Sequence, residues 1–380
     1  MRTAQQARSL PRPATRPPWG HLSRWTGDAL TLLEEGAALG PVFRLRLWRS
    51  AFVGYTPEWN RFILTNIEQF RSRGSLSQLS PYLSAGVVAL DAPGHRARRA
   101  ELNPSFHRRM MVSRFDDDFA ELAAALLPTG EFDAVAWASE VVTACIVRAF
   151  VGQQFPPGVL KAFLRPLDRP MPGPLLPRPI KIRRMQRALR HSFTDPDPTT
   201  LTPLFAQLTD GAEEARVALA AAYDTTAHAL AFGLWELAGH PQFNDPSLTS
   251  DIVSETLRLY PSGWIGSRVS NSDIEFDELR VPAGTMVLYS PYLTHRSPEV
   301  WEDPLVFRPE RFTGSIPAWG YLPFSAGERT CLGAAMATTI LRAAVAAFSN
   351  STLRRVSGDG RPRGSLTLTP RGPLILSRTM

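Results

Sequence analysis

The sequence predicts a single, mainly helical domain with small β-sheets, an α+β arrangement. Helical patterning of apolar residues dominates residues 95–150 and recurs in the long run EEARVALAAAYDTTAHALAFGLWELAGHP, which begins at Glu213. Short strand-like patterns occur instead at VFRLRLWRSAFVGY, within residues 42–70, and over residues 263–290. Because these strand-like stretches are short and separated, we expect several small sheets rather than one large one.

The first 18 residues, MRTAQQARSLPRPATRPP, are rich in arginine and proline. They contain no apolar core long enough for a signal peptide or a membrane anchor. We therefore expect a flexible arm over residues 1–18, followed by one domain over residues 19–380. Further along, residues 166–180 contain too many prolines for a regular helix. They are expected to form a long loop that closes over a pocket.

The run from Glu213 has the length of a membrane span, but charged or ionisable residues interrupt it. A long helix through the middle of a soluble domain is therefore expected, ended by Gly239 and Pro241. After it we expect a helix ending at SETLRLYP, short strands, a coil ending at FRPERF, and a final helix at AAMATTILRAAVAAF.

The composition is that of an ordinary globular protein, with 44% apolar and 20% charged residues. The formal net charge is +7, and Lys161 and Lys181 are the only lysines. No basic run with interleaved aromatic residues and no nucleic-acid-binding module is present, so nucleic acid is not an expected partner. The spread of arginine favours an anionic cofactor and an acidic protein partner. Two cysteines, Cys145 and Cys331, exclude a disulfide framework and fit a reducing compartment, the cytoplasm.

The two cysteines differ in their surroundings. Cys145 lies in an apolar helical run and is expected in the core. Cys331 lies in FSAGERTCLG, just before an alanine-rich helix whose N-terminus favours an anionic sulfur and lowers its pKa. Gly327 and Gly333 allow sharp turns and the close approach of a flat ligand, and Arg329 supplies a cation for a carboxylate. Together these features describe the proximal side of a haem.

The spacing F-x-x-G-x-R-x-C-x-G, at Phe324, Gly327, Arg329, Cys331 and Gly333, resembles the haem signature of the cytochrome P450 family. The resemblance covers nearly the whole chain, except that residues 240–255 are shorter than in most relatives, which implies a trimmed helix. It implies the P450 fold, a triangular helical prism around a buried haem b (iron protoporphyrin IX). Cys331 would be the axial ligand of the iron, and its thiolate would push electron density toward cleavage of the O–O bond.

A second motif of the family is E-x-x-R, which Glu255 and Arg258 match. The two residues lie three positions apart and share one helix face. With Arg311 of FRPERF they are implied to form a buried Glu–Arg–Arg network that braces the haem-side coil. Such a brace would serve folding and haem retention. If the E-x-x-R motif is considered by itself, the alternative to a buried brace is an ordinary ion pair at the protein surface.

The family also binds the haem propionates through basic residues. His95 and Arg99 match H-x-x-x-R in GHRARR, and Arg268 matches a further propionate-side arginine. With Arg329 these residues are implied to pair with the two carboxylates. Taken one at a time, each is more often a solvated surface residue.

On the long helix, Asp224 and Thr225 match the acid–threonine pair of the family. The reaction consumes two protons to release one atom of O2 as water, and the pair is implied to deliver them as catalytic residues. A threonine that merely bonds back to the previous helical turn is the alternative. Ala222 stands where the family usually has glycine, which is expected to narrow the space beside the pair and to reduce the local opening of the helix.

The substrate pocket is expected between three segments: Ser75–Asp91, the helix before Asp224 with Ala222 and Tyr223, and residues 262–266 with Trp264 and Ile265. Their apolar character favours a hydrophobic substrate, and the sequence looks most like bacterial enzymes of the carotenoid ring hydroxylase type. A carotenoid, a terpenoid or another lipid-like molecule is therefore expected. Tyr223 and Trp264 are equally compatible with ordinary core positions.

The resemblance implies a monooxygenase that uses O2. The 49 residues after Cys331 (332–380) leave no room for a flavin or iron–sulfur module, so electrons from NAD(P)H are expected through a separate ferredoxin and ferredoxin reductase. An acidic ferredoxin would dock on a basic face near Arg96, Arg108 and Arg109. We expect a monomer without a membrane anchor. A peroxide-driven peroxygenase and a non-catalytic haem-thiolate sensor are the alternatives. Relatives of the first kind tend to replace the acid–threonine pair with arginine and proline, and the second would not need the pair.

Overall fold

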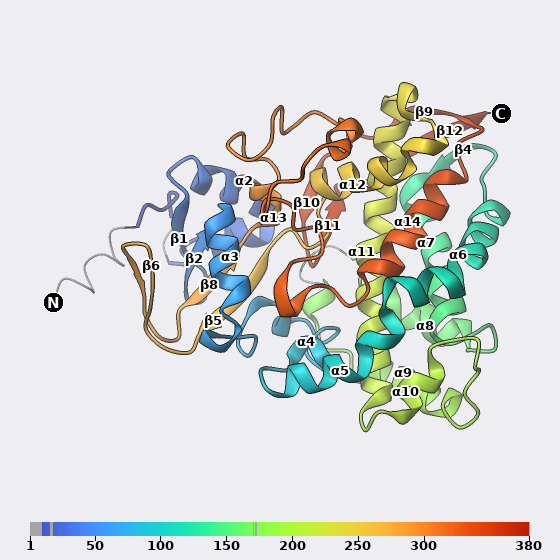
Figure 1. Ribbon diagram of the computed structural model, residues 1–380, viewed down its shortest axis with the longest axis horizontal. Helices are drawn as coiled ribbons and strands as arrows, with labels where there is room; N and C mark the ends of the chain where they lie inside the picture. The colour runs from blue at the N-terminus through green and yellow to red at the C-terminus, as the bar shows by residue number, and fades with distance from the viewer. Residues whose placement is uncertain (1–9, 16–17, 170, 172, 380) are drawn as a thin grey trace.

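The computed structural model describes residues 10–15, 18–169, 171 and 173–379. Helices fill one half of the molecule, and most strands gather in the other half with the N-terminal segments (Figure 1). The predicted fold class, mainly helical with small sheets, is confirmed. The helices are α2 Leu22–Ala37, α3 Pro57–Thr65, α4 Gly86–Ala89, α5 Gly94–Phe106, α6 Arg108–Ala125, α7 Ala134–Phe150, α8 Pro157–Leu164, α9 Pro179–Ser192, α10 Thr202–Gln207, α11 Gly211–Gly239, α12 Thr249–Leu259, α13 Pro291–Thr294 and α14 Ala334–Ala346.

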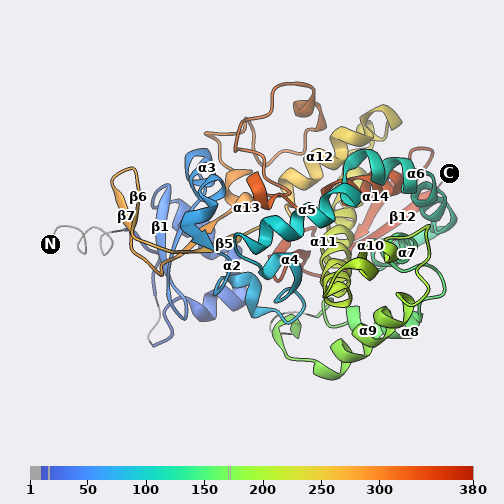
Figure 2. The same cartoon turned by 60° about the horizontal axis from the view of Figure 1, so that its bottom comes forward.

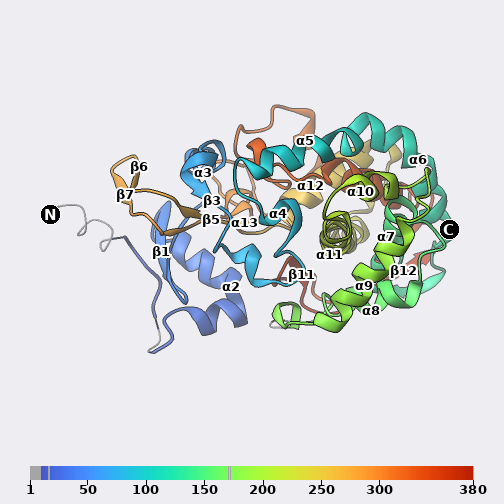
Figure 3. The same ribbon diagram turned by 90° about the horizontal axis from the view of Figure 1, so that it is seen from below.

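Helix α11 is the centre of the helical half. Its 29 residues are apolar on all sides and most are buried, as expected for a helix in the core rather than on the surface. It packs against α7, α9, α10, α12 and α14. Figure 3 looks along its axis and shows the helical half arranged around it. The helix runs without interruption through Ala222 and ends at Gly239, before a short 3-10 turn at Pro241–Phe243. In the described part of the chain, no helix is long and apolar enough to cross a membrane.

Among the described residues, the strands form four small sheets. They are β1 Val42–Arg46, β2 Ser50–Gly54, β3 Phe70–Arg71, β4 Gly130–Asp133, β5 Gly266–Ser270, β6 Ile274–Phe276, β7 Leu279–Val281, β8 Met286–Tyr289, β9 Thr352–Ser357, β10 Pro362–Gly364, β11 Leu368–Pro370 and β12 Ile375–Thr379. The largest sheet has the order β1-β2-β8-β5-β3, and only β2 and β8 run parallel in it. A second sheet, β4-β12-β9, lies beside α7 and α11.

Local sequence explains how the sheet half is assembled. Helix α3 begins where the Thr56 side chain accepts a hydrogen bond from the Trp59 N–H at 3.2 Å, which satisfies a free donor of its first turn. Trp59 is fully buried and donates its indole N–H to the Leu288 carbonyl at 2.9 Å. This bond fixes α3 on β8, and through β8 on the sheet that borders the cysteine loop.

Of the predicted arm, residues 1–9 and 16–17 lie outside the described residues. Residues 10–15 contact the sheet half: Arg44 donates its backbone N–H to Pro11 O at 2.8 Å, and His21 Nε2 lies 3.0 Å from Pro13 O. The flexible arm over residues 1–18 and the single domain after it stay predictions. The expected trimmed helix near residues 240–255 corresponds to two 3-10 turns before α12.

The cysteine loop lies where the two halves meet. In Figures 1 and 2 the segment before α14 lies next to α5, at the junction of sheets and helices. Two contacts fix this neighbourhood: Arg99 Nη1 donates to Thr330 O at 2.9 Å, and Arg96 pairs with Glu328 at 2.6 Å. The residues predicted to surround a haem therefore come from α5, β5 and the segment before α14.

Candidate active site

Cys331 lies between a 3-10 turn, Gly327–Arg329, and the first turn of α14. Its backbone N–H donates to Phe324 O at 2.8 Å, which closes the loop. Gly327 has a φ of +67°, and a Cβ there would lie 2.6 Å from Leu64 O. Only glycine fits that combination of left-handed backbone and close approach, which explains why the motif needs glycine at this position.

The Cys331 thiol has a raised pKa, contrary to the lowered value expected from its place before a helix. Burial is the largest cause, and the Gly333 N–H and the Arg99 charge oppose it. Desolvation therefore outweighs the backbone donors. The residue is nevertheless exposed to solvent, so it is not enclosed in the packed core. A coordinated metal ion deprotonates a thiol outright, so the raised pKa is compatible with a metal ligand. Cys145 is 1% exposed in the core, as predicted.

Basic side chains converge beside the cysteine. Burial, and next the positive charges of Arg329, Arg99 and Arg268, lower the pKa of His95 to about 4. Burial, followed by the charge of Arg268, likewise lowers the pKa of Arg329 to about 10. Among the described residues, His95 Nδ1, Arg99 Nε and Arg329 Nε are buried without a hydrogen-bond partner. His95 is therefore neutral, whereas Arg99 and Arg329 are cations that each keep one free donor, and Asp91 lies 3.6 Å from Arg329. Free donors on buried cations suit an anion. The residues present therefore fit a flat group with anionic substituents beside the sulfur.

The acid–threonine pair on α11 is not joined in the structure. Thr225 Oγ1 donates to Ala221 O at 2.7 Å, the bond to the previous turn that the sequence left open as an alternative. The Asp224 carboxylate points elsewhere and accepts a hydrogen bond from Thr367 Oγ1 at 2.7 Å. Asp224 is 2% exposed, and burial raises its pKa. The two side chains therefore leave α11 in different directions.

The residues predicted for the substrate pocket fall into two groups. Ala222 and Ile265 are half-buried. Tyr223 donates its hydroxyl to Asp168 Oδ1 at 2.8 Å, and residues two apart on a helix point ~200° apart, so it faces away from Thr225. Trp264 is 3% exposed, packs on Trp25 with ring centroids 5.5 Å apart, and belongs to the core. The structure thus does not favour Tyr223 and Trp264 as pocket residues beside Thr225.

The predicted brace is brought together. Glu255 and Arg258 are fully buried, and Glu255 Oε2 lies 2.6 Å from Arg258 Nε. Arg311 Nε lies 3.0 Å from Glu255 Oε1, which also accepts the Arg308 N–H at 2.8 Å. Arg258 donates further to the carbonyls of His295 and Pro304. The network therefore ties α12 to the coil that leads to the cysteine loop.

Sequence reasoning missed His295, which also belongs to this region. It is fully buried, with Nε2 accepting the Leu322 N–H at 2.7 Å and Nδ1 2.9 Å from Arg258 O. Burial lowers its pKa to about 3, so it stays neutral. No local pattern marks it, since its partners are 27 and 37 residues away.

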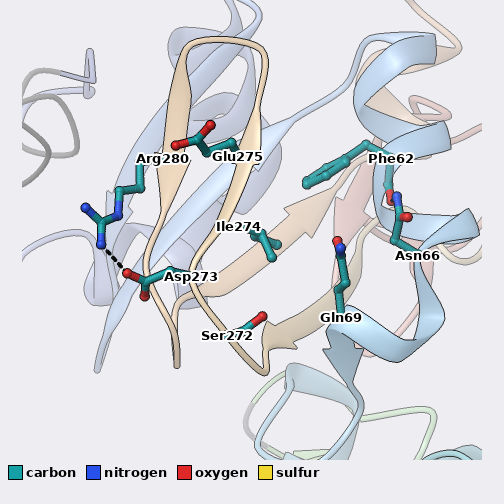
Figure 4. A pocket seen from close by; sticks show the side chains of 8 residues that line it. All are labelled: Phe62, Asn66, Gln69, Ser272, Asp273, Ile274, Glu275 and Arg280. Atoms are coloured by element: carbon teal, nitrogen blue, oxygen red, sulfur yellow. Dashed lines mark hydrogen bonds and ion pairs between the residues drawn. The ribbon is translucent and has the colours of Figure 1, made fainter.

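A surface pocket of about 550 Å³ lies elsewhere, between the end of α3 and the β6–β7 hairpin (Figure 4). Polar side chains dominate its lining, and an ion pair joins Arg280 to Asp273 there. None of the predicted site residues lines it. No group of three or more His, Cys, Asp or Glu side chains suited to a metal ion occurs in the described part of the chain.

Comparisons with known proteins agree with this site. A family model described as Cytochrome P450 matches residues 242–350, which include the brace and the cysteine loop. The chain belongs to the cytochrome P450 family. Cyclooctat-9-en-7-ol 5-monooxygenase of Streptomyces melanosporofaciens is 28% identical and the match covers 95% of this chain and 93% of the relative. Cyclooctatin synthase of the same organism is 26% identical, over 98% and 97%.

Solved structures show the P450 fold. The crystal structure of CYP175A1 from Thermus thermophilus superposes with a TM-score of 0.82 at 24% identity, covering 98% of this chain and all of that one. A six-coordinated cytochrome P450 from another strain of Thermus thermophilus gives 0.78, also at 24% identity, covering 92% and 98%. The family model and the named monooxygenase relatives, rather than these structures, support the assignment of the chain as a P450 monooxygenase, and haem is the cofactor of that family.

The P450 loop around Gly327 yields a test of backbone geometry. We expect Gly327→Ala to lower the free energy of unfolding by about 2 kcal/mol or more, because it adds left-handed strain to the contact with Leu64 O. Gly158→Ala, in α8 with open space at its Cβ position, is the matched control and should be neutral or slightly stabilising. Urea unfolding of both holoproteins measures the difference. Equal effects would contradict the assignment of strain to Gly327.

The P450 brace yields a second test. Glu255→Gln should cost about 3 kcal/mol of unfolding free energy, because it leaves two buried arginines without their carboxylate. Glu302→Gln removes a similar bond, 2.8 Å to Arg308, but the Glu302 side chain is 81% exposed, so no measurable change is expected. Thermal unfolding and the haem content of each variant are the measurements. A Glu255 variant as stable as the Glu302 variant would show that the buried network is not a brace.

Proposed function

We propose that this P450 monooxygenase inserts one atom of O2 into an apolar carbon skeleton, with a carotenoid, terpenoid or other lipid-like molecule as substrate. The observation that carries the proposal is the cysteine loop, in which the exposed Cys331 lies near Arg99 and Arg329, whose Nε donors are buried without a hydrogen-bond partner among the described residues. Two relatives that the chain matches over nearly its full length support the substrate class. The name of the first denotes oxygenation of an unsaturated alcohol.

The proposed cofactor is haem b, held by Cys331 as the axial ligand. His95, Arg99, Arg268 and Arg329 would bind its propionates, because their free donors and mutual repulsion favour an anionic partner. When bound, a thiolate-ligated haem supplies the activation of O2. Phe324, Gly327 and Gly333 shape the loop that presents the sulfur.

Proton delivery is the proposed role of Asp224 and Thr225. Thr225 is half-buried, and its hydroxyl donates its proton to Ala221 O. The oxygen of this hydroxyl therefore remains available to accept a hydrogen bond from a proton donor. Asp224 is buried, and this burial raises its pKa, which suits a carboxyl that takes up and releases protons. Because the two side chains diverge, a rotation of the Asp224 carboxyl or an intervening water has to join them.

The wall of the proposed substrate pocket is attached directly to α11. Glu214 is 3% exposed, and its carboxylate oxygens accept the Val87 N–H at 2.9 and 3.1 Å. Gly86 has a φ of +61°, and a Cβ there would lie 2.9 Å from Glu214 Oε1. Arg98 approaches the same carboxylate at 3.6 Å. Helix α4, which contains Val87 and is proposed to line the pocket, is thus held at a fixed distance from α11, the helix of Asp224 and Thr225.

The proposed electron donors are a ferredoxin and its reductase. Arg108 and Arg109 are exposed at the start of α6, beside the helix α5 that borders the cysteine loop. Arg96 is a weaker candidate than the sequence suggested, because Glu68 and Glu328 both pair with it at 2.6 Å and offset its charge. A cytoplasmic location, a monomeric state and the absence of a membrane anchor stay predictions from the sequence.

Carbon monoxide binding tests the proposed function. The dithionite-reduced holoprotein should give the red-shifted Soret band of an anionic sulfur donor opposite carbon monoxide. Cys331→Ala should lose that band and all product formation. Cys145→Ala, which changes the other cysteine, should keep both. A wild-type protein without the shifted band, or a Cys331 variant that retains it, would overturn the proposal.

The substrate class is tested in the same preparation. With ferredoxin, reductase and NADPH, the holoenzyme should oxygenate members of a panel of carotenoids and terpenoids and leave polar compounds unchanged. Product that forms only with added peroxide would point instead to a peroxygenase.

Charge reversal tests the docking face. Arg108→Glu with Arg109→Glu should slow reduction by an acidic ferredoxin about tenfold at low salt and flatten its salt dependence, because electrostatic steering is lost. Arg184→Glu with Arg187→Glu, on α9 on another side of the molecule (Figure 3), is the control of equal charge change. Stopped-flow reduction measures both. Identical rates in the two variants would place the donor elsewhere.

A further inference from the structure

The Asp224 carboxylate has one satisfied and one free oxygen. Oδ2 accepts the Thr367 hydroxyl at 2.7 Å. Oδ1 is buried without a hydrogen-bond partner among the described residues, and His228 Nδ1 lies 3.4 Å from it. The same nitrogen lies 3.4 Å from Thr367 Oγ1. One acid, one imidazole and one hydroxyl thus form a compact cluster inside the protein.

The partner hydroxyl comes from a rigid part of the chain. Thr367 lies in the turn between β10 and β11, 143 residues from Asp224. Trp264 Nε1 donates to Ser365 O at 3.1 Å, and the Leu368 N–H donates to Ser262 O at 3.1 Å. These bonds hold the turn in place without help from Asp224, so Thr367 fixes the carboxylate rather than following it.

Burial favours an arrangement of this cluster without net charge. Asp224 is 2% and His228 7% exposed, and a buried carboxylate is costly unless a positive partner or a proton neutralises it. His228 is the titratable group nearest the free oxygen that the structure shows. A proton on Nδ1 gives an ion pair, and a proton on Oδ1 gives two neutral groups. Either placement leaves the buried pair without net charge.

A cavity connects the cluster to the outside of α11. Its volume is about 470 Å³, and His228 and Tyr223 line it from α11. The start of α7 with the residue before it, the segment after α8 and the residues around β10 and β11 form the rest. The charged or titratable groups that share the lining with His228 are Asp133, Asp168, Arg169, Tyr223, Arg363 and Arg371. His228 therefore lies between this polar cavity and Asp224.

We propose that His228 transfers protons from this cavity to Asp224, while Thr367 holds the Asp224 carboxylate in position to receive them. In each transfer the Nδ1–H bond breaks and an O–H bond forms on Oδ1. The imidazole becomes neutral and then regains a proton from cavity water. No electrons move in this exchange, and the proton goes on from Asp224 toward Thr225. The inference rests on the proposed role of Asp224 in proton delivery.

The alternative is a purely structural contact that secures the β10–β11 turn to α11. The end of helix α11 offers a control for that reading. His240 lies four residues after Glu236, with Nδ1 also 3.4 Å from a carboxylate oxygen. It has the same spacing from its carboxylate, but it directly follows α11, is half-buried and does not line the cavity.

Nuclear magnetic resonance of histidine-labelled holoenzyme, as its diamagnetic ferrous carbon monoxide complex, tests the shared proton. The His228 resonance is identified by its absence in His228→Gln. Because a carboxylate favours the charged imidazole, Asp224→Asn should shift the His228 titration midpoint to lower pH and leave that of His240 unchanged. A His228 midpoint that does not respond to Asp224→Asn would overturn the proposal.

Turnover supplies the second measurement. Glutamine keeps a polar side chain of similar length but carries no titratable proton. General acid–base groups typically raise a reaction rate by about 10²–10⁴-fold. Because His228 acts through Asp224, we expect a smaller effect: His228→Gln should lower the product formed per NADPH about tenfold. Substrate binding, haem content and the carbon monoxide band should not change. His240→Gln should match the wild type throughout.

The outcomes separate the two hypotheses. Normal coupling in His228→Gln, with impaired coupling in Asp224→Asn, would overturn the histidine relay and leave the proposed function intact. Normal coupling in both variants would overturn the role of Asp224 and the relay with it. A holoenzyme that forms no product at all would count against the proposed function, and the resonance measurement would still decide whether His228 and Asp224 exchange a proton.

Discussion

The structure around the cysteine loop depends on an imbalance of buried charge. His95, Arg99 and Arg329 each carry one buried donor without a partner among the described residues, and burial, followed by neighbouring positive charges, lowers the pKa of His95 and of Arg329. Asp91, 3.6 Å from Arg329, offsets part of this charge, and a bound anionic group would offset more. The Glu255 brace and the Gly327 turn hold the surrounding chain in place against this repulsion, so cofactor binding and folding stability are linked through the same few contacts.

Neighbouring side chains of the central helix reach different surroundings. Thr225 lies at the proposed oxygen site, whereas Asp224 lies beside His228, which lines a polar cavity. Residues one position apart on a helix point ~100° apart, so adjacent residues reach different environments without any distortion. In this P450 the helix is continuous through Ala222, and the side chains rather than a local break in the backbone direct the polar path.

The sequence predicted those parts of the site whose partners are close in the chain. The cysteine loop spans ten residues, and Glu255 and Arg258 are one helical turn apart, so their spacing alone indicates their geometry. Sequence reasoning failed where partners are distant or where burial decides. Thr367 is 143 residues from Asp224, and desolvation reversed the expected pKa of Cys331. Helical periodicity alone would have shown that Tyr223 and Thr225 face opposite ways.

The bond between Glu214 and the Val87 N–H has a mechanical consequence. Because the Glu214 carboxylate on the central helix accepts the Val87 N–H of α4, α4 cannot move outward without breaking these two hydrogen bonds or moving the helix with it. The position of α4 and the alignment of Asp224 and Thr225 are therefore coupled through this one contact. If α4 walls the proposed substrate pocket, a molecule too large for that pocket would disturb both, and selection by size would then act on turnover as well as on affinity.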